Sequence, residues 1–203
     1  MMQINIDKKT GILLSVIGVL ALSLAILGIS MLSGKKDHDH SNMMGGMHHS
    51  SAGKVLSASD AMFLQMMIPH HEQAIVMSDL ALKISKNKEL ISLAAQIKAA
   101  QDPEITQMKK WLADDGLSED PGHSMDGMGG MLSDDELVAL GNSTGSEFDR
   151  KFLAGMIEHH VGAVEMVKML NRTQVTELKI FGEQIVKTQT SEIELMRSLL
   201  SKI

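Results

Sequence analysis

Residues 63–71 read FLQMMIPHH, and residues 152–160 read FLAGMIEHH. The Phe-Leu, Met-Ile and His-His pairs occupy the same places in both stretches. The match continues in register through three further identical pairs: Asp60 and Asp149, Ala74 and Ala163, and Met77 and Met166. Similarity at a constant spacing indicates an internal repeat. The chain therefore contains two copies of one structural unit.

A second match shows how long each copy is. After a slip of one residue, Gln101, Glu104, Ile105 and Met108 recur as Gln189, Glu192, Ile193 and Met196. Each copy thus holds two segments with the apolar spacing of helices, at residues 59–112 and 146–201. One amphipathic hairpin cannot bury its own apolar face, so the two hairpins must pack together. We expect an all-α four-helix bundle at residues 58–203 with an internal pseudo-twofold axis.

Local signals place the helix ends. Three residue pairs resemble capping boxes: Ser57 with Asp60, Ser133 with Glu136, and Thr144 with Glu147. The middle pair predicts a short helix at 133–140, after a Met/Gly-rich linker at 114–132. Lys86-Asn87 and Asn171 mark the hairpin turns. Pro69 and Pro103 fall inside helices and are expected to kink them.

The N-terminal segment predicts a membrane anchor. No charged residue lies between Thr10 and Gly34, and about 20 apolar residues suffice to cross a bilayer. A cleaved signal peptide is the alternative, but its apolar region is about 7–15 residues long and ends in an A-x-A-like site. No such site follows this run. We expect a tail at 1–10, a single-pass transmembrane helix at 11–33 and a Met/His-rich linker at 34–57.

Lysines flank the apolar run on both sides and give no clear orientation. The short N-terminal tail, and the many Met and His residues after the apolar run, favour a globular part outside the cytoplasm, in the periplasm or at the cell surface.

Composition excludes several classes of function. The chain has no cysteine, which rules out disulfides, thiolate metal sites and c-type haem attachment. A net charge of −6 with no basic block argues against nucleic acid as a partner. No activated nucleophile or acid–base carboxylate pair is visible, so we expect no enzyme activity.

Methionine and histidine are unusually frequent, at 18 and 9 residues. On a helix, Phe63, Met66, Ala74 and Met77 fall on the same face as His70, and Met67 lies roughly 60° away. His71 falls near the edge of this face. In the second copy, Phe152, Ala163 and Met166 fall beside His159, with Met156 roughly 60° away. The candidate metal ligands are Met66, Met67, His70, His71, Met77, Met156, His159, His160 and Met166.

The alternative is that these residues are ordinary core, since Met fills gaps and a buried His is often simply hydrogen-bonded. The His-His pair recurs at the same position of both repeats, and this favours metal binding over ordinary core packing. Thioether and imidazole donors suit Cu(I), and Ag(I) by analogy. The expected metal is copper, Cu(I) before Cu(II), with silver as a substitute. The chain lacks the Glu-x-x-His motif of di-iron bundles, which argues against a ferritin-type oxidase.

The linkers repeat the same residue types. A second tier of candidate ligands combines linker and helix residues: Met43, Met44, Met47, His48, His49, His123, Met125, Met128, Met131, Met108 and Met196. The linker residues would capture ions and pass them to the bundle. A plain solvated linker is the alternative.

At the repeated F-L-x-x-M-I-x-H-H-x-x-A-x-x-M and Q-x-x-E-I-x-x-M motifs, residues 57–201 resemble a bacterial family known as domain of unknown function 305. The resemblance implies a ferritin-like four-helix bundle, export from the cytoplasm, and copper binding or tolerance. It points to Met67, His70, His71 and Met77, and to their counterparts Met156, His159, His160 and Met166. Val161 departs from the family, because a polar residue often follows the His pair there.

We therefore expect a membrane-anchored binding protein for Cu(I) or Ag(I), acting in copper sequestration, tolerance or transfer. Its partners would be the membrane, through residues 11–33, and a copper carrier or exporter. Two alternatives remain open: a copper- or haem-dependent redox protein, and a helical bundle that binds a protein partner without metal.

Overall fold

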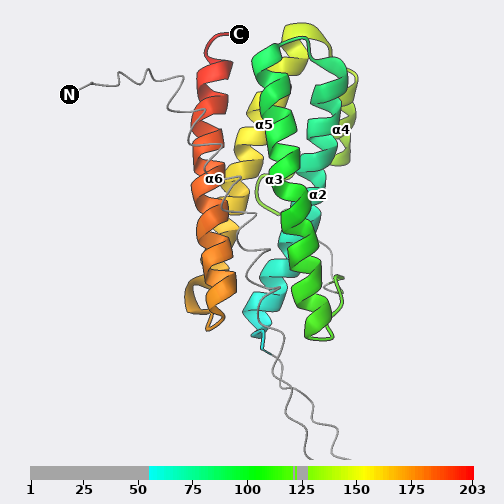
Figure 1. Ribbon diagram of the computed structural model, residues 1–203. Helices are drawn as coiled ribbons and strands as arrows, with labels where there is room; N and C mark the ends of the chain where they lie inside the picture. The colour runs from blue at the N-terminus through cyan, green and yellow to red at the C-terminus, as the bar shows by residue number, and fades with distance from the viewer. Residues whose placement is uncertain (1–54, 121, 123–127) are drawn as a thin grey trace, which may run out of the picture. The chain divides into compact units, whose positions relative to one another are not determined.

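The computed structural model describes residues 55–120, 122 and 128–203. The predicted anchor at 11–33 and nearly all of the linker at 34–57 lie outside the described residues. In the described part, no helix is both long and apolar enough to cross a membrane. The elements there are all helical (Figure 1): α2 Ala58–Ile84, α3 Lys88–Asp114, α4 Asp134–Gly141, α5 Gly145–Met166, the 3-10 helix η1 Val167–Arg172, and α6 Thr176–Leu200.

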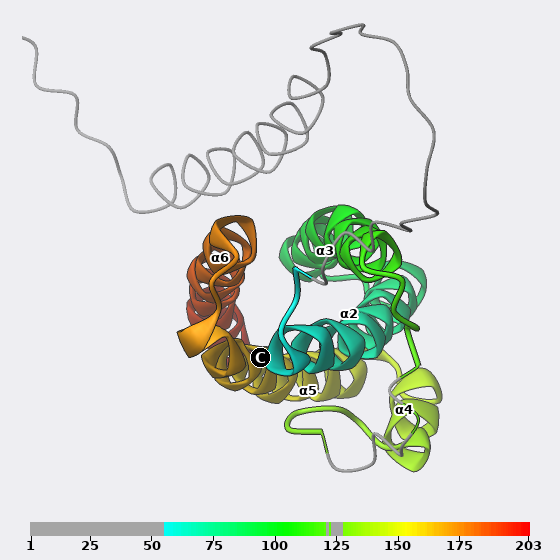
Figure 2. The ribbon, with the colours of Figure 1, turned by 90° about the horizontal axis from the view of Figure 1, so that it is seen from below.

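The four long helices form two hairpins that pack together. Helix α2 pairs with α3, α5 pairs with α6, and the hairpins meet mainly through α2 and α5. Figure 2 looks along the bundle and shows α2 beside α5, with α4 outside the four long helices. The predicted all-helical fold is confirmed for these residues, and α4 spans Asp134–Gly141 beside the range predicted for a short helix.

Two of the three predicted capping boxes are present. The Ser57 side chain accepts from the Asp60 amide while the Asp60 side chain accepts from the Ser57 amide, and Ser133 and Glu136 do the same. The third prediction was wrong, because Thr144 makes no side-chain cap hydrogen bond. The helix does begin after Thr144, but its first residue, Gly145, has φ +60° in place of the negative φ of a regular helix. Glu147 instead pairs with Lys151 at 2.8 Å.

Helices α2 and α3 run through Pro69 and Pro103.

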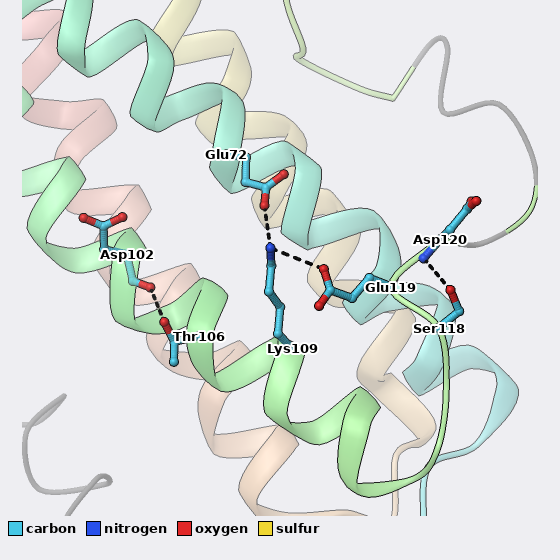
Figure 3. A network of polar contacts seen from close by, with 7 residues as sticks. All are labelled: Glu72, Asp102, Thr106, Lys109, Ser118, Glu119 and Asp120. Carbon is cyan, nitrogen blue, oxygen red and sulfur yellow. Dashed lines mark hydrogen bonds and ion pairs between the residues drawn. The ribbon is translucent and has the colours of Figure 1, made fainter.

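A surface network ties α3 to its neighbours (Figure 3). Lys109 Nζ lies 2.8 Å from Glu72 Oε1 on α2 and 3.3 Å from Glu119 Oε2 in the loop after α3. The hydrogen bond from Lys109 to Glu72 raises the lysine pKa. Exposed pairs of this kind contribute about 1 kcal/mol or less each, so the apolar core holds the bundle together.

That core is divided into two parts. The first, here the upper cluster, includes Ala74, Met77, Leu90, Ile97, Phe152, Met156 and Met196. The second, the lower cluster, includes Phe63, Met67, Met108, Leu112, Met166, Leu178 and Ile185. Along α2 the lower cluster comes first, whereas along α5 the upper cluster comes first. The two inner helices are therefore antiparallel, as the pseudo-twofold axis requires.

Candidate metal centre

A layer of polar side chains separates the two apolar clusters. Each long helix changes from one cluster to the other across a pair of buried or half-buried polar residues. We call these eight residues the central polar layer: His70, His71, Gln101, Glu104, His159, His160, Gln189 and Glu192. The repeat therefore places chemically identical groups on both sides of the pseudo-twofold axis.

The four histidines form a row through the bundle. The rings of His70 on α2 and His159 on α5 meet at the helix crossing, with centroids 3.7 Å apart. The ring of His71 lies 6.5 Å from that of His70, and the ring of His160 lies 6.2 Å from that of His159. All four residues are fully buried. His71 is thus not at the edge of the buried face, because α3 covers that side.

The outer histidine of each pair is bound to a carboxylate. His71 Nε2 lies 2.9 Å from Glu104 Oε2 on α3, and His160 Nε2 lies 2.7 Å from Glu192 Oε2 on α6. Sequence reasoning missed both glutamates as site residues. The available signal was the repeat, which places Glu104 and Glu192 three residues after the matched Gln101 and Gln189.

Several ring nitrogens of the layer have no hydrogen-bond partner. They comprise Nδ1 of all four histidines and Nε2 of His159. His70 Nε2 has only the carbonyl oxygen of Gly129, at 3.4 Å. The side chains of Gln101 and Gln189 also keep unpaired buried polar atoms. Such atoms cost about 1–3 kcal/mol each when nothing satisfies them, so this concentration points to a binding site.

The inner histidines are neutral at physiological pH. Burial, and secondarily the neighbouring His71, lower the pKa of His70 from 6.5 to about 3. Burial, followed by the charge of His70, likewise holds the pKa of His159 well below its usual value. A neutral imidazole has a free lone pair, which is the form that coordinates metal ions.

The structure regroups the predicted methionine ligands. The lower cluster holds Met67, Met108 and Met166, and the upper cluster holds Met77, Met156 and Met196. Each trio contains one residue from α2, one from α5 and one from an outer helix. The outer helix is α3 for the lower cluster and α6 for the upper cluster. Met77, predicted on the face of His70, and Met67, predicted roughly 60° from it, thus lie on opposite sides of the polar layer. Met66 is half-buried beside the lower cluster.

The remaining candidates are distributed as follows. Met128 is buried in the lower cluster, and Met131 packs against it. The other linker candidates, Met43, Met44, Met47, His48, His49, His123 and Met125, lie outside the described residues. Within the described ranges, no group of three or more His, Asp or Glu is arranged to hold a metal ion. The methionine thioethers are the soft donors that this part of the chain offers beside the imidazoles.

Residues 128–132, here called the strap, cover the inner histidines. Gln73 on α2 holds the strap at two points, donating to the Leu132 carbonyl and accepting from the Leu132 amide, both at 2.8 Å. On α5, a Cβ at Gly162 would lie 1.8 Å from the Gly129 carbonyl oxygen. The missing side chain lets the two backbones touch. The strap also lines a surface cavity of about 520 Å³ together with Gly155 and Glu158.

Replacing Gly162 by Ala is expected to displace the strap. The added methyl group would overlap the Gly129 backbone, and overpacking of this kind costs about 1–3 kcal/mol, more than the gain in helix propensity of about 1 kcal/mol. Thermal unfolding would show a lower Tm. Gly141→Ala at the end of α4 is the control, since its Cβ would meet only the Leu80 side chain, at 3.7 Å, and its Tm should not fall. An unchanged Tm for Gly162→Ala would contradict the backbone contact.

The fold and the site define a class: an all-helical bundle of two repeated hairpins with a buried imidazole layer between methionine-containing clusters. The family model "Domain of unknown function (DUF305)" matches residues 60–200. The chain belongs to the DUF305 family, as its repeated motifs suggested. Among curated proteins, none matches the sequence.

Solved structures of relatives share this fold. A DUF305 fragment from Deinococcus radiodurans has a TM-score of 0.68 at 32% identity, covering 72% of this chain and 98% of that one. A candidate secreted DUF305 protein from Streptomyces coelicolor has a TM-score of 0.67 at 32% identity, covering 72% and 93%. CopM in its Cu(I)-bound form has a TM-score of 0.62 at 33% identity, covering 72% and 98%. CopM has also been solved with Cu(II) and with silver.

Val161, where the sequence departs from the family pattern, is 36% exposed. Its side chain therefore lies off the buried face that carries His159 and His160. The departure leaves the central polar layer unchanged.

Proposed function

We propose that this protein binds Cu(I), and Ag(I) as its analogue, within the helical bundle, and that it is a binding protein rather than an enzyme. Its role would be copper sequestration, tolerance or transfer. The observation that carries the proposal is the central polar layer, where buried imidazole nitrogens lack partners and lie between two methionine trios.

The donor set supports a soft ion. Thioether sulfur and neutral imidazole prefer Cu(I) among the common biological metals, whereas Mg²⁺ and Ca²⁺ require oxygen ligands. Coordination would also satisfy the unpaired nitrogens, which are otherwise a cost to the folded state. The copper and silver forms of CopM, at 31–33% identity, lend support from a relative.

The location belongs to the same proposal. Residues 11–33 would anchor the chain as a single transmembrane helix, with the bundle outside the cytoplasm, and the candidate secreted relative supports export. The linker methionines and histidines would then collect ions before they reach the bundle or a copper carrier or exporter. A reporter fused at Ile203 that works only outside the cytoplasm is the expected result, and one that works only in the cytoplasm would contradict it.

The direct test replaces the two inner histidines. We expect His70→Ala with His159→Ala to weaken Cu(I) binding by at least about 100-fold, which corresponds to about 2.7 kcal/mol. Competition against a coloured Cu(I) chelator under anaerobic conditions measures this change.

The matched control is Phe63→Leu with Phe152→Leu. These residues are fully buried, occupy the same two helices and are related by the repeat, so the control perturbs the core without removing a donor. The control should bind Cu(I) like the wild type. Unchanged affinity in the histidine variant would remove the inner pair from the site.

A further inference from the structure

The two carboxylate–histidine contacts have a chemical consequence for the outer histidines. An ionised carboxylate has no proton to donate and acts only as a hydrogen-bond acceptor. The ring nitrogen that faces it must therefore carry the proton. Nε2 of His71 faces Glu104 at 2.9 Å, and Nε2 of His160 faces Glu192 at 2.7 Å. In a neutral imidazole the proton then lies on Nε2, and the lone pair lies on Nδ1.

The surroundings leave the second ring nitrogen of each outer histidine open. Nδ1 of His71 and Nδ1 of His160 are buried and have no hydrogen-bond partner. A lone pair at Nδ1 leaves a site that a metal ion can satisfy.

The same geometry occurs twice. The glutamates are 17% and 12% exposed while both imidazoles are completely buried, so each pair joins the bundle surface to its interior. The inner histidines have no carboxylate: His70 has one long contact to a carbonyl, and neither ring nitrogen of His159 has a partner. The tautomer is therefore specified only at the outer positions.

We propose that Glu104 and Glu192 are positioning residues that hold His71 and His160 in the Nε2–H tautomer and thereby present Nδ1 of each ring to the bound soft metal ion. This rests on the proposed copper function. It assigns the metal-facing atom of the outer histidines and explains why a glutamate recurs in both repeats. Carboxylate partners of this kind orient metal-binding imidazoles and increase their basicity.

The test uses the full-length protein and two measurements. Long-range ¹H–¹⁵N correlation spectra of the apoprotein distinguish a protonated ring nitrogen from one with a free lone pair. We expect His71 and His160 to show protonated Nε2 and unprotonated Nδ1. In Glu104→Gln with Glu192→Gln, the amide can donate as well as accept, so this tautomer should lose its dominance. Cu(I) affinity should fall by about 10- to 100-fold.

The matched control is Glu89→Gln with Glu194→Gln. These two glutamates are exposed on the same two outer helices, so the control changes net charge equally without touching the layer. It should keep both the tautomer and the affinity. Circular dichroism checks that each variant retains its helices.

The outcomes separate this inference from the proposed function. Wild-type rings protonated at Nδ1, or a glutamine variant with unchanged tautomer and affinity, would overturn the positioning role even if copper binds tightly. Wild-type protein that binds no Cu(I) would instead overturn the copper function and, with it, the metal-facing assignment.

Discussion

Replacing the six buried methionines of the two clusters with leucine is expected to abolish tight Cu(I) binding while the bundle stays folded. The residues are Met67, Met77, Met108, Met156, Met166 and Met196. Leucine conserves the volume, and exchanges of this kind cost less than about 1.5 kcal/mol each. Leucine has no sulfur donor, so the imidazoles would be left without the soft ligands that Cu(I) prefers.

The loss of affinity should be at least about 1,000-fold, equivalent to about 4.1 kcal/mol. Chelator competition gives the affinity, and circular dichroism with thermal unfolding reports the fold. The two trios can also be replaced separately. Loss of half of the bound copper in each trio variant would indicate two separate sites, one on each side of the polar layer.

The control repacks the same core and keeps every sulfur. Ile97→Leu, Ile105→Leu, Ile185→Leu and Ile193→Leu alter buried side chains of both clusters. This variant should bind Cu(I) normally. If the variant with all six methionines replaced bound copper as tightly as the wild type, methionine sulfur would have no role in the site. The soft-metal proposal would then fail.

Acid is expected to destabilise the apoprotein strongly. Burial lowers the pKa of His70 from 6.5 to about 3 and that of His159 in the same direction. Below pH 6.5 the unfolded chain takes up protons at these two rings while the folded chain does not. The unfolded state then binds more protons, so stability falls as the pH decreases and recovers as it rises.

Each histidine contributes up to about 1.4 kcal/mol per pH unit in this window. His70, whose pKa falls to about 3, would therefore remove about 3 kcal/mol over two pH units, and His159 acts in the same direction. That is a large part of the whole stability of many domains. Urea unfolding of the metal-free protein at a series of pH values between 7 and 4 measures the slope.

The variant His70→Ala with His159→Ala removes both groups and should show a flatter dependence on pH. Phe63→Leu with Phe152→Leu keeps both histidines and should retain the wild-type slope. Equal slopes in the two variants would mean that the inner histidines do not account for the acid sensitivity.

Much of the architecture follows from neighbouring residues in the chain. Helical periodicity, two capping boxes and the recurring FLxxMI-x-HH motif suffice to predict two hairpins and their pairing. They also identify His70 and His159 as buried, because a helix face is specified by residues a few positions apart. The cap at Thr144 was mispredicted because the positive φ of Gly145 depends on how the chain enters α5.

The arrangement of the site depends instead on contacts between distant segments. Antiparallel packing of α2 on α5 brings the rings of His70 and His159 together, with centroids 3.7 Å apart, and gathers methionines from three helices into each cluster. The packing of α3 and α6 against α2 and α5 brings Glu104 and Glu192 to the outer histidines. Gln73 holds the strap over the inner histidines. Periodicity along one helix gives the face of a residue but not its partner, since that partner is chosen by the register between helices.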